Sequence, residues 1–305
     1  AVYATNANLT LFAKWNINTY TLTVKYYDFK GNDAVAMTVA ATGNTIAGSP
    51  VTFVTGGTAS ATVKRTYTTV AQTVTISASA TGKNYYIKAD AAAGVGSTMN
   101  SITYSWTPNA NKTINIYVCQ CYTIGFNGNG ATSGSMNPQP KAHGTDVTLT
   151  ANAFVKTGYT FQGWSTSNTS STIAYKGGAT YSANADVNLY AVWGINTYTA
   201  KIKYVAYRGV KTGSNIPTIS VGGSGVTSVS NIAVGATAEL TATYGTNCML
   251  LASTNGQTDS YNRFAINWSD APGSIGTTNS KSWDAKSDIE LSIYVYDAYT
   301  IQYTA

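Results

Sequence analysis

Apolar and polar residues alternate along most of this chain, as they do in strands whose successive side chains face opposite sides of a sheet. The alternation is clearest in Thr19–Phe29, which ends at the turn-forming residues Gly31–Asp33. The same pattern predicts seven further strands before residue 121: Val35–Ala41, Val51–Thr55, Ala59–Tyr67, Val70–Ala78, Tyr85–Ala89, Ile102–Trp106 and Ile114–Val118. Short strands at this density, without the period of an amphipathic helix, predict an antiparallel sandwich of the immunoglobulin type.

A second set of predicted strands repeats this design later in the chain: Thr197–Tyr207, Thr218–Val221, Ala238–Thr243, Met249–Leu251, Arg263–Trp268 and Ile289–Tyr296. The chain also repeats in sequence, because Ala1–Thr21 and Ala179–Thr199 are identical at 12 of 21 positions. A repeat period of 177–178 residues indicates an array of whole domains. We therefore predict one sandwich module at residues 16–121 and a second at residues 194–298.

The segment between the two copies, residues 122–193, has a different pattern. Its middle, Gly158–Trp164, reads GYTFQGW, and its end, Leu189–Trp193, reads LYAVW. This combination resembles the Listeria–Bacteroides repeat, the B-repeat family of internalin-like surface proteins. The resemblance implies a compact β-grasp unit that occurs in tandem on secreted or surface-anchored bacterial proteins. The chain as a whole is then expected to be all-β, with immunoglobulin-like sandwiches and small β-grasp repeats alternating.

The motif residues are expected to be the structural core of this repeat: Tyr122, Phe126, Gly158, Tyr159, Phe161, Gly163, Trp164, Leu189, Tyr190 and Trp193. Gly158 and Gly163 suit a bend entering a strand, where no side chain fits. Trp164 and Trp193 are each large enough to bury on the order of 200 Å². The alternative for the two tryptophans is an exposed platform that stacks on sugar rings.

The two ends of the chain resemble parts of the same repeat. Residues 1–15 correspond to Ala179–Trp193, the C-terminal part of a repeat, and residues 299–305 correspond to Tyr122–Gly128, its first strand. The two ends cannot together rebuild a repeat, because the equivalent of Asn129–Gly178 is absent from both. We expect the chain to be a window on a longer repeating polypeptide.

The junctions between the predicted modules are short. Trp193 is followed at once by the strand-forming residues Gly194–Tyr198. Ile114–Val118 continues through Cys119–Cys121 into Tyr122–Phe126 with no glycine or proline before Gly125. Linkers of two or three residues leave little freedom between domains, unlike glycine- or proline-rich tethers. The sequence therefore predicts a stiff, extended rod.

Charge argues against nucleic acid as a partner. The net charge is +6, but only 10% of residues are charged. The first copy has seven basic and three acidic residues, whereas the second has seven of each. Two copies that differ in this way do not share a basic binding face. No apolar run is long enough for a membrane helix, so we expect no membrane insertion in this segment.

Catalytic chemistry has little support in the sequence. The only histidine, His143, lies in a predicted turn, where an exposed and solvated side chain is expected. Cys119, Cys121 and Cys248 lack histidine neighbours at zinc-ligand spacing and are expected to be buried small residues. The closest carboxylates are Asp284, Asp288 and Glu290, at a strand entrance of the second copy. We therefore expect no enzyme activity, no cofactor and no metal site.

Two functions from different classes fit the sequence. The first is a structural segment of a large secreted or cell-surface bacterial repeat protein, acting as a stalk or extracellular fibre, with copies of itself as partners. The second is an adhesin whose sandwich modules bind a surface glycan or a host protein. In that case exposed aromatic residues of pairs such as Tyr26-Tyr27 or Tyr85-Tyr86 would form a contact surface. Adjacent residues in a strand face opposite ways, so at least one of each pair is expected to be core.

Overall fold

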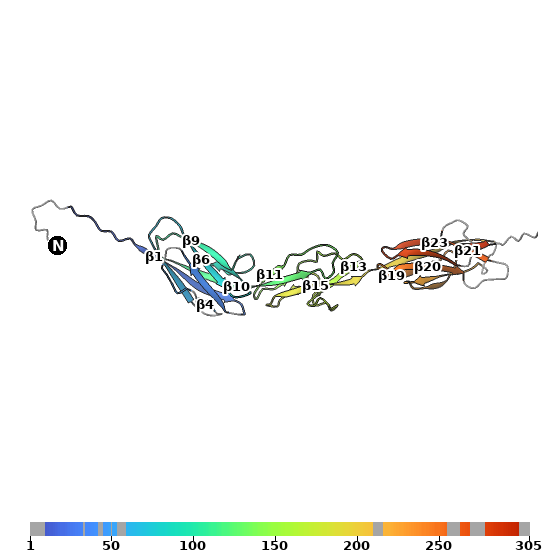
Figure 1. The fold of residues 1–305 in the computed structure, drawn as a ribbon, viewed down its shortest axis with the longest axis horizontal. Helices are drawn as coiled ribbons and strands as arrows, with labels where there is room; N and C mark the ends of the chain where they lie inside the picture. The colour runs from blue at the N-terminus through green and yellow to red at the C-terminus, as the bar shows by residue number, and fades with distance from the viewer. Residues whose placement is uncertain are drawn as a thin grey trace, which may run out of the picture.

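The computed structural model describes residues 10–32, 34–41, 45–49, 51–53, 59–209, 216–254, 263–268 and 278–298. Within these ranges every regular element is a β-strand, so the all-β class predicted from the alternation is confirmed. None of the described residues belongs to a helix that could cross a membrane. Figure 1 shows three groups of strands that follow one another along the longest axis of the view. The segments 1–9 and 299–305, expected to belong to further repeats, lie outside the described residues.

The first group of strands forms two facing sheets. One sheet has the order β3-β5-β1-β10-β7-β8, with the bounds β1 (Thr19–Lys30), β3 (Thr45–Ala47), β5 (Ala59–Thr66), β7 (Asn84–Ala89), β8 (Thr98–Met99) and β10 (Lys112–Asn127). The other has the order β4-β2-β6-β9, with the bounds β2 (Val35–Ala40), β4 (Val51–Phe53), β6 (Gln72–Ser79) and β9 (Ser101–Trp106). Alternate residues of β1 and β6, such as Leu22, Val24, Val74 and Ile76, are fully buried between the sheets.

The last group of strands has the same two-sheet design. One sheet has the order β19-β16-β23-β21, with the bounds β16 (Thr197–Arg208), β19 (Thr237–Thr243), β21 (Arg263–Asn267) and β23 (Ile289–Ala298). The other has the order β18-β17-β20-β22, with the bounds β17 (Ile219–Ser224), β18 (Val229–Ile232), β20 (Asn247–Thr254) and β22 (Thr278–Asp284). These orders match β5-β1-β10-β7 and β4-β2-β6-β9 strand for strand. The sequence-related Trp106 and Trp283 are both buried.

The middle group has a separate hydrophobic cluster. Its main sheet contains the second half of β10 with β11 (Gln139–Ala142), β13 (Tyr159–Ser165) and β15 (Val187–Ile195). A small two-stranded sheet pairs β12 (Val147–Thr148) with β14 (Thr180–Tyr181). The fully or nearly buried residues of this cluster are Ile124, Leu149, Trp164, Tyr181, Leu189 and Ala191.

The first and last strands of each group are parallel neighbours. Strands β1 and β10 pair at eight positions, β16 and β23 at eight, and β10 and β15 at four. The two longer ladders carry a bulge at matching places, which leaves Tyr27 and Val205 without a partner in the register. The prediction of an antiparallel sandwich is therefore wrong for β1–β10 and β16–β23, since alternation along a strand says nothing about the direction of its neighbour.

Candidate functional site: the junctions between units

The first junction is a single strand. The first half of β10 pairs with β1 and with β7, whose last partner is Cys121. From Cys121 onward β10 pairs with β11, and from Ile124 with β15. One continuous strand therefore belongs to both units, and no linker residue separates them. The local reason lies in the sequence, because Lys112–Ile124 contains neither glycine nor proline to end the strand.

A small apolar cluster covers this junction. Cys119 and Cys121 are free and buried, and they pack with Tyr86 of β7 and Ala142 of β11. Their side chains lie in one cluster, as their spacing of two residues in a strand predicts. Burial raises the pKa of the Cys119 thiol, which disfavours the reactive thiolate. The two cysteines therefore serve as small core residues that join the units.

Tyr85 and Tyr86 offer no exposed ring for the contact surface of the adhesin hypothesis. Tyr85 points into the first sandwich and is 0% exposed, while Tyr86 is 3% exposed in the junction cluster. The two residues face opposite sides of the sheet, but both sides are covered here. Of the other pair, Tyr26 is buried and Tyr27 is 61% exposed, in contact with the ring of Tyr117 at 5.1 Å.

A buried lysine anchors the polar side of the same junction. Lys141 of β11 is 0% exposed, and its Nζ donates to Asn184 Oδ1 at 2.8 Å. The ammonium group also lies 5.7 Å from the centre of the Tyr122 ring. Burial lowers the pKa of Lys141, and Asp146 opposes that change. Because an unpaired buried ammonium is costly, the position of Asn184 in the loop before β15 is tied to β11.

Asn32 connects the first sandwich to the repeat across this junction. Its Nδ2 donates to Tyr122 Oη at 3.1 Å and to the Asn184 carbonyl at 3.2 Å. Its backbone N–H donates to Gln120 Oε1 at 2.9 Å, and Gln120 is itself only 4% exposed. The turn after β1 is therefore bonded to the strand and loop that enter the next unit. Asn32 and Asn184 did not stand out in the sequence, because single asparagines are common in this chain.

His143 also belongs to this junction, so the expected exposed histidine is wrong. It lies in a turn, as predicted, but is half-buried, with Nδ1 3.0 Å from Tyr122 Oη. Burial lowers the pKa of His143 below its usual 6.5, and the positive charge of Lys141 lowers it further. The neutral imidazole is therefore the form that fits beside Tyr122 and Lys141.

Acidification is expected to destabilise this junction through His143. Because the folded pKa is lowered, the contribution of the neutral ring to stability is complete above pH 6.5 and is lost as the pH falls through the folded pKa. The melting temperature of the chain should fall between about pH 7.5 and pH 5.5, above the range in which carboxylates titrate. His143→Gln, which keeps a hydrogen-bonding side chain, should flatten this dependence. Identical slopes in both proteins would contradict the prediction.

The second junction consists of one residue, Asn196, between β15 and β16. Its backbone N–H donates to the Gly158 carbonyl at 2.9 Å, and its carbonyl accepts from Tyr244 N–H at 2.8 Å. Its side-chain Oδ1 accepts from Thr160 Oγ1 at 2.7 Å. Asn196 is therefore hydrogen-bonded to both neighbouring units.

Aromatic rings complete the second junction. The Tyr244 ring, from the second sandwich, lies 6.5 Å from Tyr159 of the repeat and 6.4 Å from Tyr198. Lys156 Nζ lies 4.5 Å from the centre of the Tyr159 ring. Gly158 has φ +77°, and a Cβ atom there would meet Tyr244 Cδ1 at 2.0 Å. Glycine is therefore required at position 158 both by the backbone conformation and by the neighbouring unit.

The first sandwich carries the same arrangement at its N-terminal end. Tyr67 N–H donates to the Asn18 carbonyl at 2.8 Å, and the Tyr20 and Tyr67 rings are 6.3 Å apart. These contacts match those of Asn196, Tyr198 and Tyr244. Here, however, Tyr67 is 51% exposed, so its outer face is open to solvent.

The predicted core residues of the repeat fall into three groups. Trp164 and Leu189 are fully buried in the central cluster, with the half-buried Phe126, Phe161 and Trp193 packed around them. Tyr122 is buried as predicted, but at the first junction, and Tyr159 is half-buried at the second. Tyr190 is half-buried and lies outside the central cluster. Gly158 belongs to the second junction, and a Cβ at Gly163 (φ +153°) would lie 2.6 Å from Ile173.

The buried position of Trp164 rules it out as a platform for sugar rings. Its ring lies 5.0 Å from Phe126, 4.9 Å from Phe161 and 6.3 Å from Phe154. Trp193 packs on Phe161 at 5.8 Å and donates its indole N–H to the Gly128 carbonyl at 2.9 Å. The aromatic side chains of the motif therefore contact one another.

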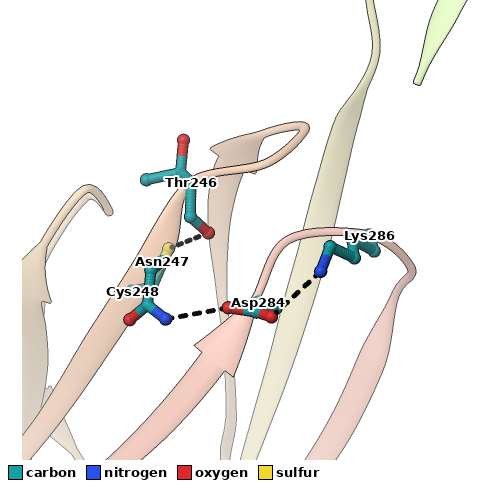
Figure 2. Close-up of polar contacts among 5 residues, drawn as sticks. All are labelled: Thr246, Asn247, Cys248, Asp284 and Lys286. Atoms are coloured by element: carbon teal, nitrogen blue, oxygen red, sulfur yellow. Dashed lines mark hydrogen bonds and ion pairs between the residues drawn. The ribbon is translucent and has the colours of Figure 1, made fainter. Parts of the chain in front are cut away.

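The carboxylates at the strand entrance of the second sandwich make structural contacts. Figure 2 shows Asp284 between Asn247 and Lys286, which approach its two oxygens at 2.9 Å and 3.2 Å. Asp288 accepts a hydrogen bond from the Thr199 backbone at 2.7 Å. Among the described residues there is no group of three or more histidine, cysteine or carboxylate side chains that could hold a metal ion.

Residues 122–192 match the family model of the Listeria-Bacteroides repeat domain, which confirms the resemblance for this segment. A sequence comparison with curated proteins gave no significant match. Among solved structures, the major pilin from Streptococcus pyogenes is 11% identical, and the match covers 93% of this chain and 99% of the pilin with a TM-score of 0.19. The pilus adhesin SpaC from Lactobacillus rhamnosus GG is 7% identical, with coverages of 88% and 57% and a TM-score of 0.22. TM-scores this low do not indicate a common overall fold.

Proposed function

With residues 122–192 assigned to the Listeria-Bacteroides repeat family, we propose that this chain is a non-enzymatic structural segment of a large secreted or cell-surface bacterial protein. In this proposal the sandwich and repeat units alternate and form a stiff rod that serves as a stalk or extracellular fibre. Copies of the same protein are its partners in a fibre. The surface location rests on the family, whose members the repeat resembles in sequence.

The parallel pairing of the first and last strands in every unit is the observation that carries this proposal. When neighbouring strands are parallel, the chain enters a unit at one end and leaves it at the opposite end. Successive units then extend in one direction instead of folding back on each other. Strand β10 continues from one unit into the next, and Asn196 alone connects β15 to β16. Connections this short favour a rod over a flexible string of domains.

We propose the module boundaries 1–15, 16–121, 122–193, 194–298 and 299–305 for this alternation. The exposed apolar residues before β1 support the first boundary. Leu11, Phe12 and Trp15 are 83%, 89% and 87% exposed, yet they correspond to Leu189, Tyr190 and Trp193 of the repeat. The open face of the Tyr20–Tyr67 pair is where a preceding repeat would dock, as Tyr159 docks on Tyr244.

Small-angle X-ray scattering of the chain in solution tests the rod. A compact chain of 305 residues would have a radius of gyration of about 19 Å. Three units in a line should give a clearly larger value and a pair-distance distribution with one long tail. A radius near the compact value, or a broad mixture of bent forms, would contradict the proposal. Electron microscopy of the longer parent protein would then distinguish single stalks from assembled fibres.

The adhesin hypothesis has weaker support in the structure. Of the two aromatic pairs named for it, only Tyr27, beside Tyr117, offers an exposed ring. The second sandwich has Val205 in place of Tyr27, so the two copies do not share this surface. Binding to a sugar array by the intact chain, lost on Tyr27→Ala, would establish that function.

A further inference from the structure

One hydrogen bond recurs at the entrance of both sandwich ladders. In the first sandwich the Thr21 backbone N–H donates to Asn111 Oδ1 at 2.8 Å, and in the second the Thr199 N–H donates to Asp288 Oδ1 at 2.7 Å. The donor lies near the start of the first strand, and the acceptor is the residue just before the last strand. The paired register of each ladder begins at the next position, Leu22↔Lys112 and Ala200↔Ile289. We call this bond the clasp.

The repeat between the sandwiches has the same clasp although its fold is different. Thr123 N–H donates to Asp186 Oδ1 at 2.6 Å, and the parallel register begins at the next position, Ile124↔Val187. Shared ancestry of the two sandwiches explains the clasp in those units but not in the repeat. What the three units have in common is a parallel pair of terminal strands, so the clasp accompanies that pair.

Parallel terminal strands have a definite response to tension along the chain. Tension pulls the first strand by its beginning and the last strand by its end, and in a parallel pair these points lie at opposite ends of the ladder. The strands must then slide past each other, so the backbone hydrogen bonds between them are loaded together. In an antiparallel terminal pair the two points would lie at the same end, and the bonds would open one at a time.

The tension path passes through all three ladders in series. It runs from β1 to β10 through eight paired positions, from β10 to β15 through four, and from β16 to β23 through eight. Strand β10 is shared, so the load passes from the first ladder to the second without leaving a strand. Each clasp lies at the end where the first strand of its ladder receives the load.

We propose that this chain carries tension along its length, and that the clasps at Asn111, Asp186 and Asp288 hold the loaded end of each terminal ladder closed. This inference rests on the proposed stalk or fibre function and adds to it a mechanical property of each unit. A stalk that only displays another domain does not need its units to resist pulling.

The test is single-molecule force spectroscopy of the full chain with handles at its two ends. Asp186→Ala should shorten the lifetime of the repeat at constant force by roughly tenfold, the rate change that corresponds to loss of one hydrogen bond to a charged group. Asp288→Ala should do the same for the second sandwich. Asn111→Ala removes a bond to a neutral amide and should shorten the lifetime of the first sandwich by several-fold. The length of chain released on opening identifies the unit, and it also verifies that the unit was folded.

Two controls separate the clasp from a general loss of stability. Asp186→Asn and Asp288→Asn keep an acceptor oxygen, as Asn111 already provides, and should retain most of the lifetime. Lys176→Ala, at an exposed charged residue of the same repeat outside the ladder, should leave it unchanged. Equal lifetimes for the wild type and the three clasp-to-alanine variants would overturn the role of the clasp.

The pulling direction provides a second, independent test. Positions 19 and 66 face each other at one end of the antiparallel β1–β5 pair, so handles there should open the first sandwich at much lower force. Equal forces in the two directions would overturn the tension proposal. If scattering still showed an extended rod, the proposed stalk function would stand without the tension proposal. A compact particle in scattering would reject the stalk function itself, whatever the forces.

Discussion

Trp164→Ala is expected to unfold residues 122–193 while the two sandwiches remain folded. Trp164 is 0% exposed and contacts Phe126, Phe154 and Phe161. Removing a buried tryptophan costs about 3–5 kcal/mol. At about 0.05 kcal/mol per residue, the lower end of the usual range, a unit of this size has a stability of about 4 kcal/mol, which a loss of this size removes. Because each sandwich has a hydrophobic cluster of its own, the loss of stability should be largely confined to the repeat.

Hydrogen exchange resolved along the chain measures this outcome directly. In the variant, amides of β13 and β15 should exchange freely, whereas those of β6 and β20 should stay protected. Trp193→Ala is the matched control, since Trp193 is only half-buried and the same substitution there should cost less. Full protection of β13 in the Trp164→Ala protein, or loss of protection throughout the chain, would contradict three separate cores.

Gly158→Ala is expected to separate the second junction and to destabilise the repeat. The residue has φ +77°, which costs an alanine about 1–2 kcal/mol. Its new Cβ would also meet the Tyr244 ring at 2.0 Å, and relieving such overlap typically costs a further 1–3 kcal/mol. The tyrosine must move away, and the contacts between Tyr244 and Tyr159 are then lost. Fluorescence energy transfer between labels on the repeat and the second sandwich should report a wider range of distances.

Gly178→Ala provides the matched control for the backbone contribution. Gly178 has a similar φ of +73°, but nothing lies within 4 Å of the position a Cβ would take. This variant should show only the backbone cost, with an unchanged junction. Combining Gly158→Ala with Tyr244→Ala should recover part of the lost melting temperature, since the clash is removed. If the two single glycine variants behave alike, contact with Tyr244 is not what requires glycine at position 158.

Most strands follow directly from the sequence, and the exceptions have a physical cause. Alternation predicted β1, β5 and β16 to within one residue at either end. It missed β18 and β22, whose residues VSNI and TNSKSWD are too polar to alternate clearly. Such segments become strands only because a neighbouring strand supplies their hydrogen bonds.

The junctions show the same division between local and tertiary causes. The absence of glycine and proline from Lys112–Ile124 predicted an uninterrupted connection, and the structure has one strand there. The polar contacts across this junction could not be predicted, because Asn32 and Asn184, which form one of them, are 152 residues apart in the chain. Tyr244 likewise becomes a contact for Gly158 only after both units have folded.

The sequence by itself determined the all-β class, the internal repetition and the Listeria-Bacteroides repeat at residues 122–192, because these depend on local alternation and on residue identity. Tertiary structure decided the direction of the terminal strands, the burial of Tyr85, Tyr86 and Lys141, and the clasp at each ladder. These depend on which distant segments become neighbours. Strand direction in particular cannot be read from local alternation. It nevertheless determines that the chain enters each unit at one end and leaves it at the opposite end.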